Sequence, residues 1–470
     1  MGNFFIAVGG TGQMVAVAYW KLQQLIPWCK PAEMYYMDRD PITNLTAIIP
    51  SIKDIDPLPE GITSDTDFCD YFYDPANPEL TSNILNCLFT GEEQRTPIHT
   101  GMYGRPPVGA SMIKARFLAT AADSGRADQD SFADLVNTLN DGNRHIVCIC
   151  GSAKGGTGAG GVPSTAQYID QKLQVGGNRA NVRIYVFYFL KHFTLTLPGG
   201  EGNGPSIIND QIRRNAESGM CYLKDEIAKG VDGTLLLGLD SAPQRNYQEV
   251  GVQSEQCEFL HLLAAVQLQR VFLGEEFPGN LCGYAIPEGG LPLNNLTVRL
   301  PNNNQVGLGN LLKLNEAVAE LLLLFKKLID PLPGFSFVSA LPRNFEKILS
   351  RLERDLSRNK EDICNDIATS LESTVEKLTA LYNWFVMDDG LLPRAKSNNF
   401  LNFNKSDIKI TSGKYERLKG HPMDFIRKWC DKMGDVRIIQ KDDYAKELCN
   451  KLKDAVYKCL DEELFGKTFL

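Results

Sequence analysis

The sequence predicts an α/β protein, with a mainly parallel sheet covered by helices on both faces and a second, α+β region that ends in long helices. Short apolar runs alternate with stretches of helical spacing as far as residue 239, which is typical of βαβ units. Beyond residue 308, helical spacing dominates. A chain of 470 residues is too long for one compact core, so we expect two or three domains.

The first half of the chain begins with an apolar run at residues 3–8, which predicts a buried strand. Glycines at 9–12 follow it, and residues 13–26 then have the spacing of a helix. Residues 50–90 are rich in Asp, Pro and Thr and show no clear period. The other strands of this half are expected at residues 33–37, 145–150, 182–190 and 234–239, and its other helices at residues 111–122, 130–139, 164–173 and 206–229.

A long, largely apolar stretch at residues 254–273 predicts a helix that is buried between layers or domains, because little of its circumference is polar. We place a domain boundary there. The expected division is a first domain at 1–253, a central helix at 254–274, a mixed segment at 275–342 and a helical region at 343–470. Within the last two segments we expect a helix at 308–329, a strand at 334–341, one or two helices over 343–385 and a last helix at 442–465.

The composition argues against several classes of function. A net charge of −8 does not suit a general binder of nucleic acid or of anionic membranes. No apolar run reaches the ~20 residues that span a bilayer. The 12 cysteines are scattered without a CxxC pair and the 5 histidines lie far apart, which argues against structural zinc. Because the first residues do not form a secretory leader, we expect a cytoplasmic protein with reduced thiols.

The stretch Gly151–Pro163, with the sequence GSAKGGTGAGGVP, lies between an expected strand and an expected helix. Glycine has no side chain, so consecutive backbone N–H groups can approach an anion closely. The following helix adds a partial positive charge at its N-terminus. Glycines that serve only the packing of a tight turn are the alternative. Residues 9–12 have the same setting, and two such clusters favour phosphate binding.

Together these features resemble the tubulin/FtsZ superfamily of GTP-binding filament proteins, and most of all its divergent bacterial tubulin-like members. The resemblance covers residues 1–280 and implies a parallel-sheet GTP-binding domain with a long central helix. It rests on GGTGAG at 155–160 with Gly161-Val162-Pro163 after it, on GGTGQ at 9–13, on the strand that ends at Asp38-Arg39-Asp40, and on Ala216–Gly219.

The resemblance implies that GTP or GDP binds with Mg²⁺ at the two glycine loops. Residues 9–13 would surround the α- and β-phosphates, and residues 155–160 the β- and γ-phosphates. Two carboxylates that follow a strand would act through Mg²⁺, a hard cation that takes one or two such ligands. The residues implied in these contacts are Gly9, Gly10, Thr11, Gly12, Gln13, Asp38, Asp40, Gly155, Gly156, Thr157, Gly158, Ala159 and Gly160.

Plainer alternatives accompany these roles. Asp40 precedes a proline, and Asp-Pro is common turn chemistry, so the magnesium and turn interpretations are about even. The glycines at 9–12 could belong to a dinucleotide fingerprint, but Val15 stands where its third glycine is required. Lys154 begins a KGGTG run that resembles the deviant phosphate loop of MinD/ParA ATPases, yet Ala159 and Gly160 replace that loop's second lysine and its hydroxyl. Lys154 itself could assist phosphate or be a solvated loop lysine, the commoner case.

Further nucleotide contacts are implied outside the two loops. The loop at 101–109 would sense the γ-phosphate through Gly104 and Arg105, unless its prolines only force a surface turn. The ribose would be held by Glu201 with Arg213 or Arg214. The base would be read near the start of the central helix, where the nearest polar side chains are Gln253 and Glu255. Polar residues at a helix start are more often caps, so adenine stays open beside guanine.

The expected water-positioning acid is missing from its usual place. Tubulins and FtsZ carry an asparagine and this acid in the loop after the central helix, where this chain has Cys282 and Tyr284. Another register, over residues 291–297, supplies asparagines but no carboxylate. Nearby acids that could substitute are Glu275, Glu276 and Glu288. Catalytic residues therefore stay unassigned, and GTP binding is better supported than GTPase activity.

Two functional hypotheses follow. The first is a filament in which GTP lies between subunits stacked head to tail, a heterologous contact that grows without closing. The second is a GTP-gated regulatory module that neither polymerises nor hydrolyses, whose helical C-terminus recruits a protein partner. The helices at 343–385 and 442–465 could serve as lateral contacts, as a partner surface or simply as a cap on the fold, and the cap is the default.

Overall fold

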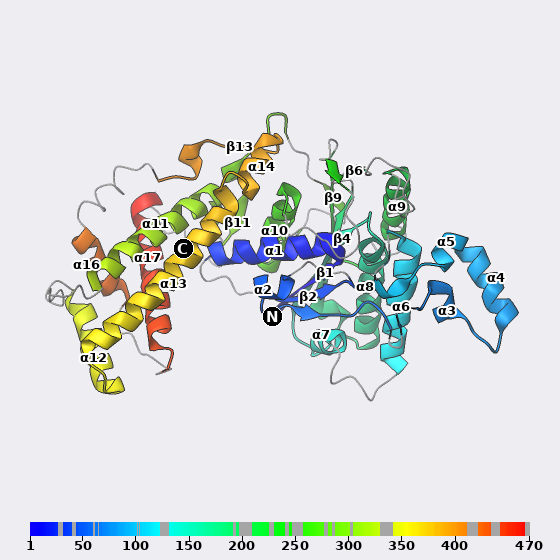
Figure 1. Ribbon diagram of the computed structural model, residues 1–470, viewed down its shortest axis with the longest axis horizontal. Helices are drawn as coiled ribbons and strands as arrows, with labels where there is room; N and C mark the ends of the chain where they lie inside the picture. The colour runs from blue at the N-terminus through cyan, green and yellow to red at the C-terminus, as the bar shows by residue number, and fades with distance from the viewer. Residues whose placement is uncertain are drawn as a thin grey trace. The chain divides into compact units, whose positions relative to one another are not determined.

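In the computed structural model the chain forms two compact units (Figure 1). The first unit consists of Met1–Trp20 and Lys30–Ala285, and the second consists of Lys21–Cys29 and Ile286–Leu470. The four-segment division expected from the sequence stays a prediction beside it. The structure describes every residue except 27–31, 40–43, 60–61, 64, 101, 103, 123–130, 191–193, 197–208, 225–229, 240–243, 247–256, 277–280, 284–286, 301–303, 330–341, 411–421, 434–441 and 466–470.

A seven-stranded sheet organises the first unit, and each of its described strand pairs is parallel. The order is β3-β2-β1-β4-β5-β7-β9, so the chain moves outward from β1 and then returns to add β4 on the other side of β1. The strands are β1 (Gly2–Val8), β2 (Glu33–Met37), β3 (Lys53–Asp54), β4 (His145–Ser152), β5 (Val182–Phe189), β7 (Gly233–Leu237) and β9 (Leu281–Gly283). A separate parallel pair joins β6 (Thr194–Thr196) to β8 (Gln244–Asn246).

Helices cover both faces of this sheet (Figure 1). Alternate residues of β1, from Phe4 to Val8, belong to one buried cluster with side chains of α6, α7 and α8. On the other face, the Phe5 ring contacts Tyr19 of α1, and Tyr19 contacts Phe272 of α10. Burial on both faces explains the continuous apolar runs, and the predicted α/β class is confirmed. The helices are α1 (Gly9–Leu25), α6 (Pro106–Ala122), α7 (Ser131–Leu139), α8 (Gly156–Val175), α9 (Asn209–Tyr222) and α10 (Phe259–Phe272).

Two helices begin earlier than their spacing predicts. α1 begins at Gly9, although helical spacing starts at residue 13, and α8 begins at Gly156, although helical spacing starts at residue 164. Glycine is a poor helix former, so local propensity points the other way. These turns contain glycine because neighbouring main chain packs so closely against them that a Cβ would collide with it. The predicted central helix is present as α10, which is buried along nearly its whole length.

The stretch at 50–90 that shows no clear period, with the residues on either side of it, contains short elements. They are α2 (Leu45–Ile48), α3 (Phe68–Phe72), α4 (Pro78–Leu88), α5 (Gly91–Gln94) and the 3₁₀ turn η1 (Ile98–Thr100). Phe68, Leu85 and Met102 belong to one small buried cluster that holds these elements together. Apart from the 11-residue α4, each of them is too short to develop a helical period.

The second unit is mainly helical, as predicted. Its described helices are α11 (Leu308–Ile329), α12 (Arg343–Leu356), α13 (Lys360–Val386), α14 (Leu391–Ser397), α16 (Pro422–Met433) and α17 (Tyr444–Phe465). The expected stretch 343–385 is two helices, because Ser357 adopts a left-handed conformation with φ 54° and ends α12. Short ladders pair β10 (Leu291–Pro292) with β13 (Leu401–Asn402) and β11 (Thr297–Arg299) with β12 (Gln305–Gly307). The strand expected at 334–341 lies outside the described residues.

Buried polar groups fix the helix contacts of this second unit. The Asn315 side chain on α11 donates to the Leu378 carbonyl on α13 at 2.9 Å and accepts from the Tyr457 hydroxyl on α17 at 3.3 Å. A buried amide that loses its partners destabilises the core, so these bonds favour one arrangement of the three helices. Among the residues the structure describes, no helix combines the length and apolar composition needed to cross a bilayer.

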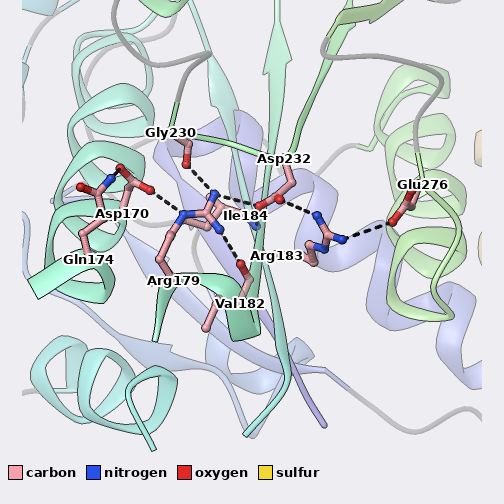
Figure 2. Close-up of polar contacts among 9 residues, drawn as sticks. All are labelled: Asp170, Gln174, Arg179, Val182, Arg183, Ile184, Gly230, Asp232 and Glu276. Carbon is pink, nitrogen blue, oxygen red and sulfur yellow. Dashed lines mark hydrogen bonds and ion pairs between the residues drawn. The ribbon is translucent and has the colours of Figure 1, made fainter. Parts of the chain in front are cut away.

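A network of ion pairs ties α8 to the amino ends of β5 and β7 (Figure 2). The Arg179 guanidinium donates to Asp170 at 2.5 Å, to Asp232 at 2.9 Å and to two backbone carbonyls. Asp232 also accepts from Arg183 and from the Ile184 backbone N–H. Burial alone would raise the pKa of Asp232, but these donors outweigh it and hold the pKa below its usual value.

Replacing the central arginine should therefore destabilise the first unit. Arg179→Gln leaves two neighbouring carboxylates without their shared cation, and we expect a loss of about 3 kcal/mol in urea unfolding near pH 7. Because the folded pKa of Asp232 is depressed, this contribution is fully present above about pH 4 and declines as the pH falls through that depressed value.

Lys53→Gln provides the control, because Lys53 pairs with Glu33 at an exposed position of the same unit. Exposed pairs contribute about 0–1 kcal/mol, so the control should unfold almost like the wild type. Equal destabilisation by both substitutions would contradict a structural role for the Arg179 network.

Candidate functional site

The two glycine loops lie against each other. Gly9 has φ +71°, a conformation that favours glycine, and a Cβ built on it would lie 3.2 Å from the Gly158 backbone nitrogen. A Cβ on Gly151 would lie 2.7 Å from the Val8 carbonyl oxygen. The loops that follow β1 and β4 therefore meet through main chain, which is the convergence that the sequence hypothesis requires.

This meeting point is the switch point of the sheet. β1 and β4 are neighbours, and the chain leaves them toward opposite edges. In open parallel sheets, ligands bind outside the carboxyl ends of the strands at such a point. The N-termini of α1 and α8 both lie there, with N–H groups that have no partner within their own helix. Aligned peptide dipoles make the position favourable for an anion.

The glycines of the second loop are of two kinds: some pack against neighbouring main chain, and one faces open space. A Cβ would lie 2.6 Å from the Met102 carbonyl oxygen at Gly156, 2.7 Å from that of Ser152 at Gly158 and 2.3 Å from the Ala110 nitrogen at Gly160. These glycines are required for close packing. Gly155 differs, because a Cβ there would meet no heavy atom within 4 Å. Gly155 is the N-cap of α8 and has no side chain that could accept from the first N–H groups of the helix. The interpretation as packing glycines therefore applies to residues 156, 158 and 160, and the interpretation as an anion site applies to Gly155.

Asp38 connects three segments at this point. It follows β2, is only 8% exposed, and accepts from Gln13 Nε2 at 3.2 Å and from Thr157 Oγ1 at 3.2 Å. Its Oδ1 also accepts from the Arg39 backbone N–H at 2.9 Å. Three residues chosen from the sequence, Gln13, Asp38 and Thr157, are thus brought together although they lie far apart along the chain. The carboxylate orients the Gln13 and Thr157 side chains beside the two helix N-termini.

Lys154 is the residue that sequence reasoning underrated. It precedes the first glycine of the loop and is 7% exposed, so it is not a solvated loop lysine. Its backbone N–H donates to Ser152 Oγ at 3.1 Å. This buried lysine lies one residue before Gly155, the N-cap of α8. The signal for it was its place directly between an apolar strand and GGTG.

The loop before α6 lies beside the glycine loops, but its arginine points to other partners. Gly104 has φ +67°, and its carbonyl accepts from Asn215 of α9 at 3.0 Å. The Arg105 guanidinium hydrogen-bonds to Thr96 Oγ1 and lies 3.7 Å from Glu92. A contact between Arg105 and a phosphate would require these bonds to change, and the implied γ-phosphate role stays a prediction.

The other implied residues are scattered or lie outside the description. Arg213 is exposed on α9 and pairs with Glu217 one turn away at 3.8 Å. Ala159 lies within α8, where its carbonyl accepts from the Tyr188 hydroxyl at 3.2 Å. Gly10, Thr11 and Gly12 form the first turn of α1. The implied residues outside the described part of the chain are Asp40, Glu201, Gln253 and Glu255.

The described start of α10 is a cap. The Glu258 backbone N–H donates to His261 Nδ1 at 2.9 Å, and the two residues satisfy each other's free groups. The His261 ring stacks on Phe189 of β5 with centroids 5.6 Å apart. The plainer interpretation of polar residues at this helix start holds for the residues described.

Two of the acids considered for catalysis are paired. Glu275 forms an ion pair with Arg270 of α10, and Glu276 lies 3.6 Å from Arg183 of β5. Both contacts lie at the amino-end side of the strands, where Figure 2 shows Glu276 beside the Arg179 network. Complete burial raises the pKa of Cys148 and Cys150 on β4 well above that of an ordinary thiol, so both stay neutral and serve packing. In the described part of the chain, no group of three metal-ligating side chains occurs.

Comparison with known proteins adds little. No family model and no curated protein matches the chain. Among solved structures, CetZ2 from Haloferax volcanii in a GTPγS-bound protofilament is similar over 58% of this chain and 57% of its own, with 15% identity and a TM-score of 0.27. CetZ1 from Haloferax volcanii, a GDP-bound monomer, is similar over 51% of each chain, with 14% identity and a TM-score of 0.26. The chain spans little more than half of either protein, and similarity at this level carries no argument about function.

Gly160 and Gly155 should respond differently to alanine. Gly160→Ala places a Cβ against the backbone of α6 and should cost about 2 kcal/mol or more in urea unfolding. Gly155→Ala enters open space at φ −85° and ψ 157°, which any residue adopts, and should cost no more than about 1 kcal/mol. A loss for Gly155→Ala as large as that for Gly160→Ala would show that the start of α8 is filled by protein and not open to an anion, because the poorer N-cap preference of alanine alone costs about 1 kcal/mol.

Proposed function

We propose that this chain is a tubulin/FtsZ-like protein that binds a guanine nucleotide where its two glycine loops meet. The observation that carries the proposal is the contact between Gly9 and Gly158 at the β1–β4 switch point. Two helix N-termini converge there, and a triphosphate needs several N–H donors and positive charge at one place. The GGTGAG and GGTGQ sequences supply the family resemblance that specifies guanine.

The phosphate contacts are assigned to the chain's own backbone. The N–H groups at the start of α8, from the open Gly155 onward, hold the β- and γ-phosphates, and those at the start of α1 hold the α- and β-phosphates. Lys154 adds a buried positive charge beside them. Gly104 and Arg105 sense the γ-phosphate once Arg105 leaves Thr96 and Glu92. Glu201 and Arg213 hold the ribose.

Magnesium fits the donor set around Asp38. Asp38 Oδ1 accepts from Thr157 and from the Arg39 backbone N–H, and Oδ2 accepts from Gln13, so a direct bond from Asp38 to Mg²⁺ would have to displace one of these donors. Mg²⁺ retains most of its waters and needs only one or two carboxylates, so Asp38, with Asp40 nearby in sequence, suits a water-bridged ion that bound phosphates would complete. When bound, the ion would offset the repulsion between the carboxylate and the phosphates.

At the level of assembly, we propose a head-to-tail filament with the nucleotide between neighbouring subunits, formed in the cytoplasm. In this arrangement the next subunit covers the nucleotide that is bound at the carboxyl ends of β1 and β4. Such an interface is heterologous and grows without closing.

A second candidate function, GTP binding without hydrolysis, is supported by the arginine contacts of Glu275 and Glu276. Arg270 pairs with Glu275, and Arg183 lies 3.6 Å from Glu276, so two of the three acids considered for catalysis contact a cation of the same subunit. In that case the protein binds GTP without turnover and acts as a gated module, and the helical second unit recruits its partner. The hydrolytic residue is left unassigned in both candidates.

Substitution at Gly155 tests phosphate binding without a change of fold. Asp and Asn are both good N-caps and have nearly the same shape, so Gly155→Asp and Gly155→Asn should both fold. The aspartate adds a negative charge where the proposal puts phosphate. We expect Gly155→Asp to bind a fluorescent GTP analogue about 100-fold more weakly than Gly155→Asn. Equal affinities for the two variants would rule the phosphate position out.

Assembly and turnover separate the two candidates. The filament predicts that GTP moves the protein into the pellet on ultracentrifugation and that GTP turnover per subunit rises with protein concentration. The gated module predicts a GTP-bound monomer at every accessible concentration, with no turnover. A strict monomer that binds GTP would exclude the filament and leave the module.

A further inference from the structure

Helix α4 presents more apolar surface than its own fold covers. Leu80, Ile84 and Leu88 lie one turn apart on the same stripe, and their exposed fractions are 60%, 47% and 65%. Leu85 is the one residue of α4 that is buried, in the small cluster with Phe68 and Met102. We call the three exposed side chains the α4 stripe. A helix normally buries its apolar arc, so a stripe left in water indicates a contact surface.

The helix is held firmly enough to present this stripe. Gln94 of α5 donates to the Leu85 and Phe89 carbonyls at 3.3 and 3.0 Å, which satisfies the C-terminal end of α4. The Phe89 ring packs edge-on against Phe68 of α3 with centroids 4.7 Å apart. Figure 1 shows α4 at the outer edge of the first unit, on the side of α3 and α5 away from α6. The stripe is therefore a fixed outer face of the unit.

The charge around the stripe is mainly acidic, although exposed Arg95 follows α5 and Arg105 lies 3.7 Å from Glu92. Between Lys53 and Arg95 the sequence carries ten acidic residues (54, 56, 60, 65, 67, 70, 74, 79, 92, 93) and neither Lys nor Arg. Asp74 and Glu79 lie at the N-terminal end of α4, and Glu92 lies exposed just beyond its C-terminal end. Acids at both ends of an apolar stripe repel acidic partners and attract basic ones.

We infer that the α4 stripe docks a basic amphipathic helix of a partner protein, whose apolar side chains pack on Leu80, Ile84 and Leu88 while its lysines or arginines meet the surrounding acids. An 11-residue helix is about 16 Å long, which matches a partner helix of about three turns. Helix-against-helix recognition of this kind uses anchors three and four residues apart on both sides. The inference does not depend on nucleotide binding.

A designed peptide tests this surface on the full-length protein. The probe is a fluorescent 18-residue helix with leucines along one face and lysines elsewhere. The expected result is saturable binding by fluorescence anisotropy that weakens about tenfold or more when salt is raised from about 0.05 M to about 0.5 M. The same peptide with every lysine replaced by glutamate should not bind. Equal binding of both peptides would overturn the charge argument.

Variants locate the contact. Leu88→Lys replaces an apolar contact of the α4 stripe with a positive charge that repels the basic peptide. This variant should bind the peptide about tenfold or more weakly. Leu80→Lys is the second variant, in case Leu88→Lys fails to fold, which circular dichroism reports. Val175→Lys is the matched control, because Val175 is 88% exposed at the end of α8 and is not part of the α4 stripe, and this variant should bind like the wild type.

Two further outcomes would contradict the proposal. Unchanged binding in both stripe variants would show that the peptide reads the acidic charge alone. The stripe could also be an interface between copies of this chain. In that case the wild type would sediment as a dimer that Leu88→Lys dissociates, and the heterologous partner would be excluded.

Discussion

The structure of the first unit depends on how closely two turns of main chain approach each other. The loop after β1 and the loop after β4 touch at Gly9 and Gly158, where a Cβ on Gly9 would make a tight contact of 3.2 Å and φ is +71°. Glycine costs helix stability where it replaces other residues. Here that cost is offset by the packing of α8 onto the neighbouring loop and onto α6. The same approach brings the first turns of two helices to one place, so the packing and the proposed anion site have one cause.

Charge is distributed to suit this arrangement. At the carboxyl end of the strands, Asp38 is buried beside two helix N-termini and accepts from Gln13 and Thr157. At the amino end, Arg179 holds Asp170 and Asp232 and fixes the far end of α8 to the sheet. α8 is therefore held in both halves, by glycine contacts at its start and by the ion pair of Asp170 with Arg179 in its second half. A rigid helix is what a site built from its first N–H groups requires.

Much of the fold could be predicted because its signals are local. The strands of the central sheet are buried on both faces, so they are continuous apolar runs such as residues 145–150. The glycine loops and Asp38 could be chosen because each directly follows such a run. The contacts between them could not be predicted, since Thr157 and Asp38 are 119 residues apart. The division between packed glycines and the open Gly155 depends likewise on Met102 and Ala110, which come from another part of the chain.

Hydrogen exchange of the two loops with and without GTP tests the central claim most directly. If one triphosphate binds both helix N-termini, the backbone amides of residues 9–13 and those of residues 155–160 should gain protection together, at the same GTP concentration. Residues at the amino ends of β5 and β7 should not change. Protection of one loop alone, or of neither at saturating GTP, would contradict the account.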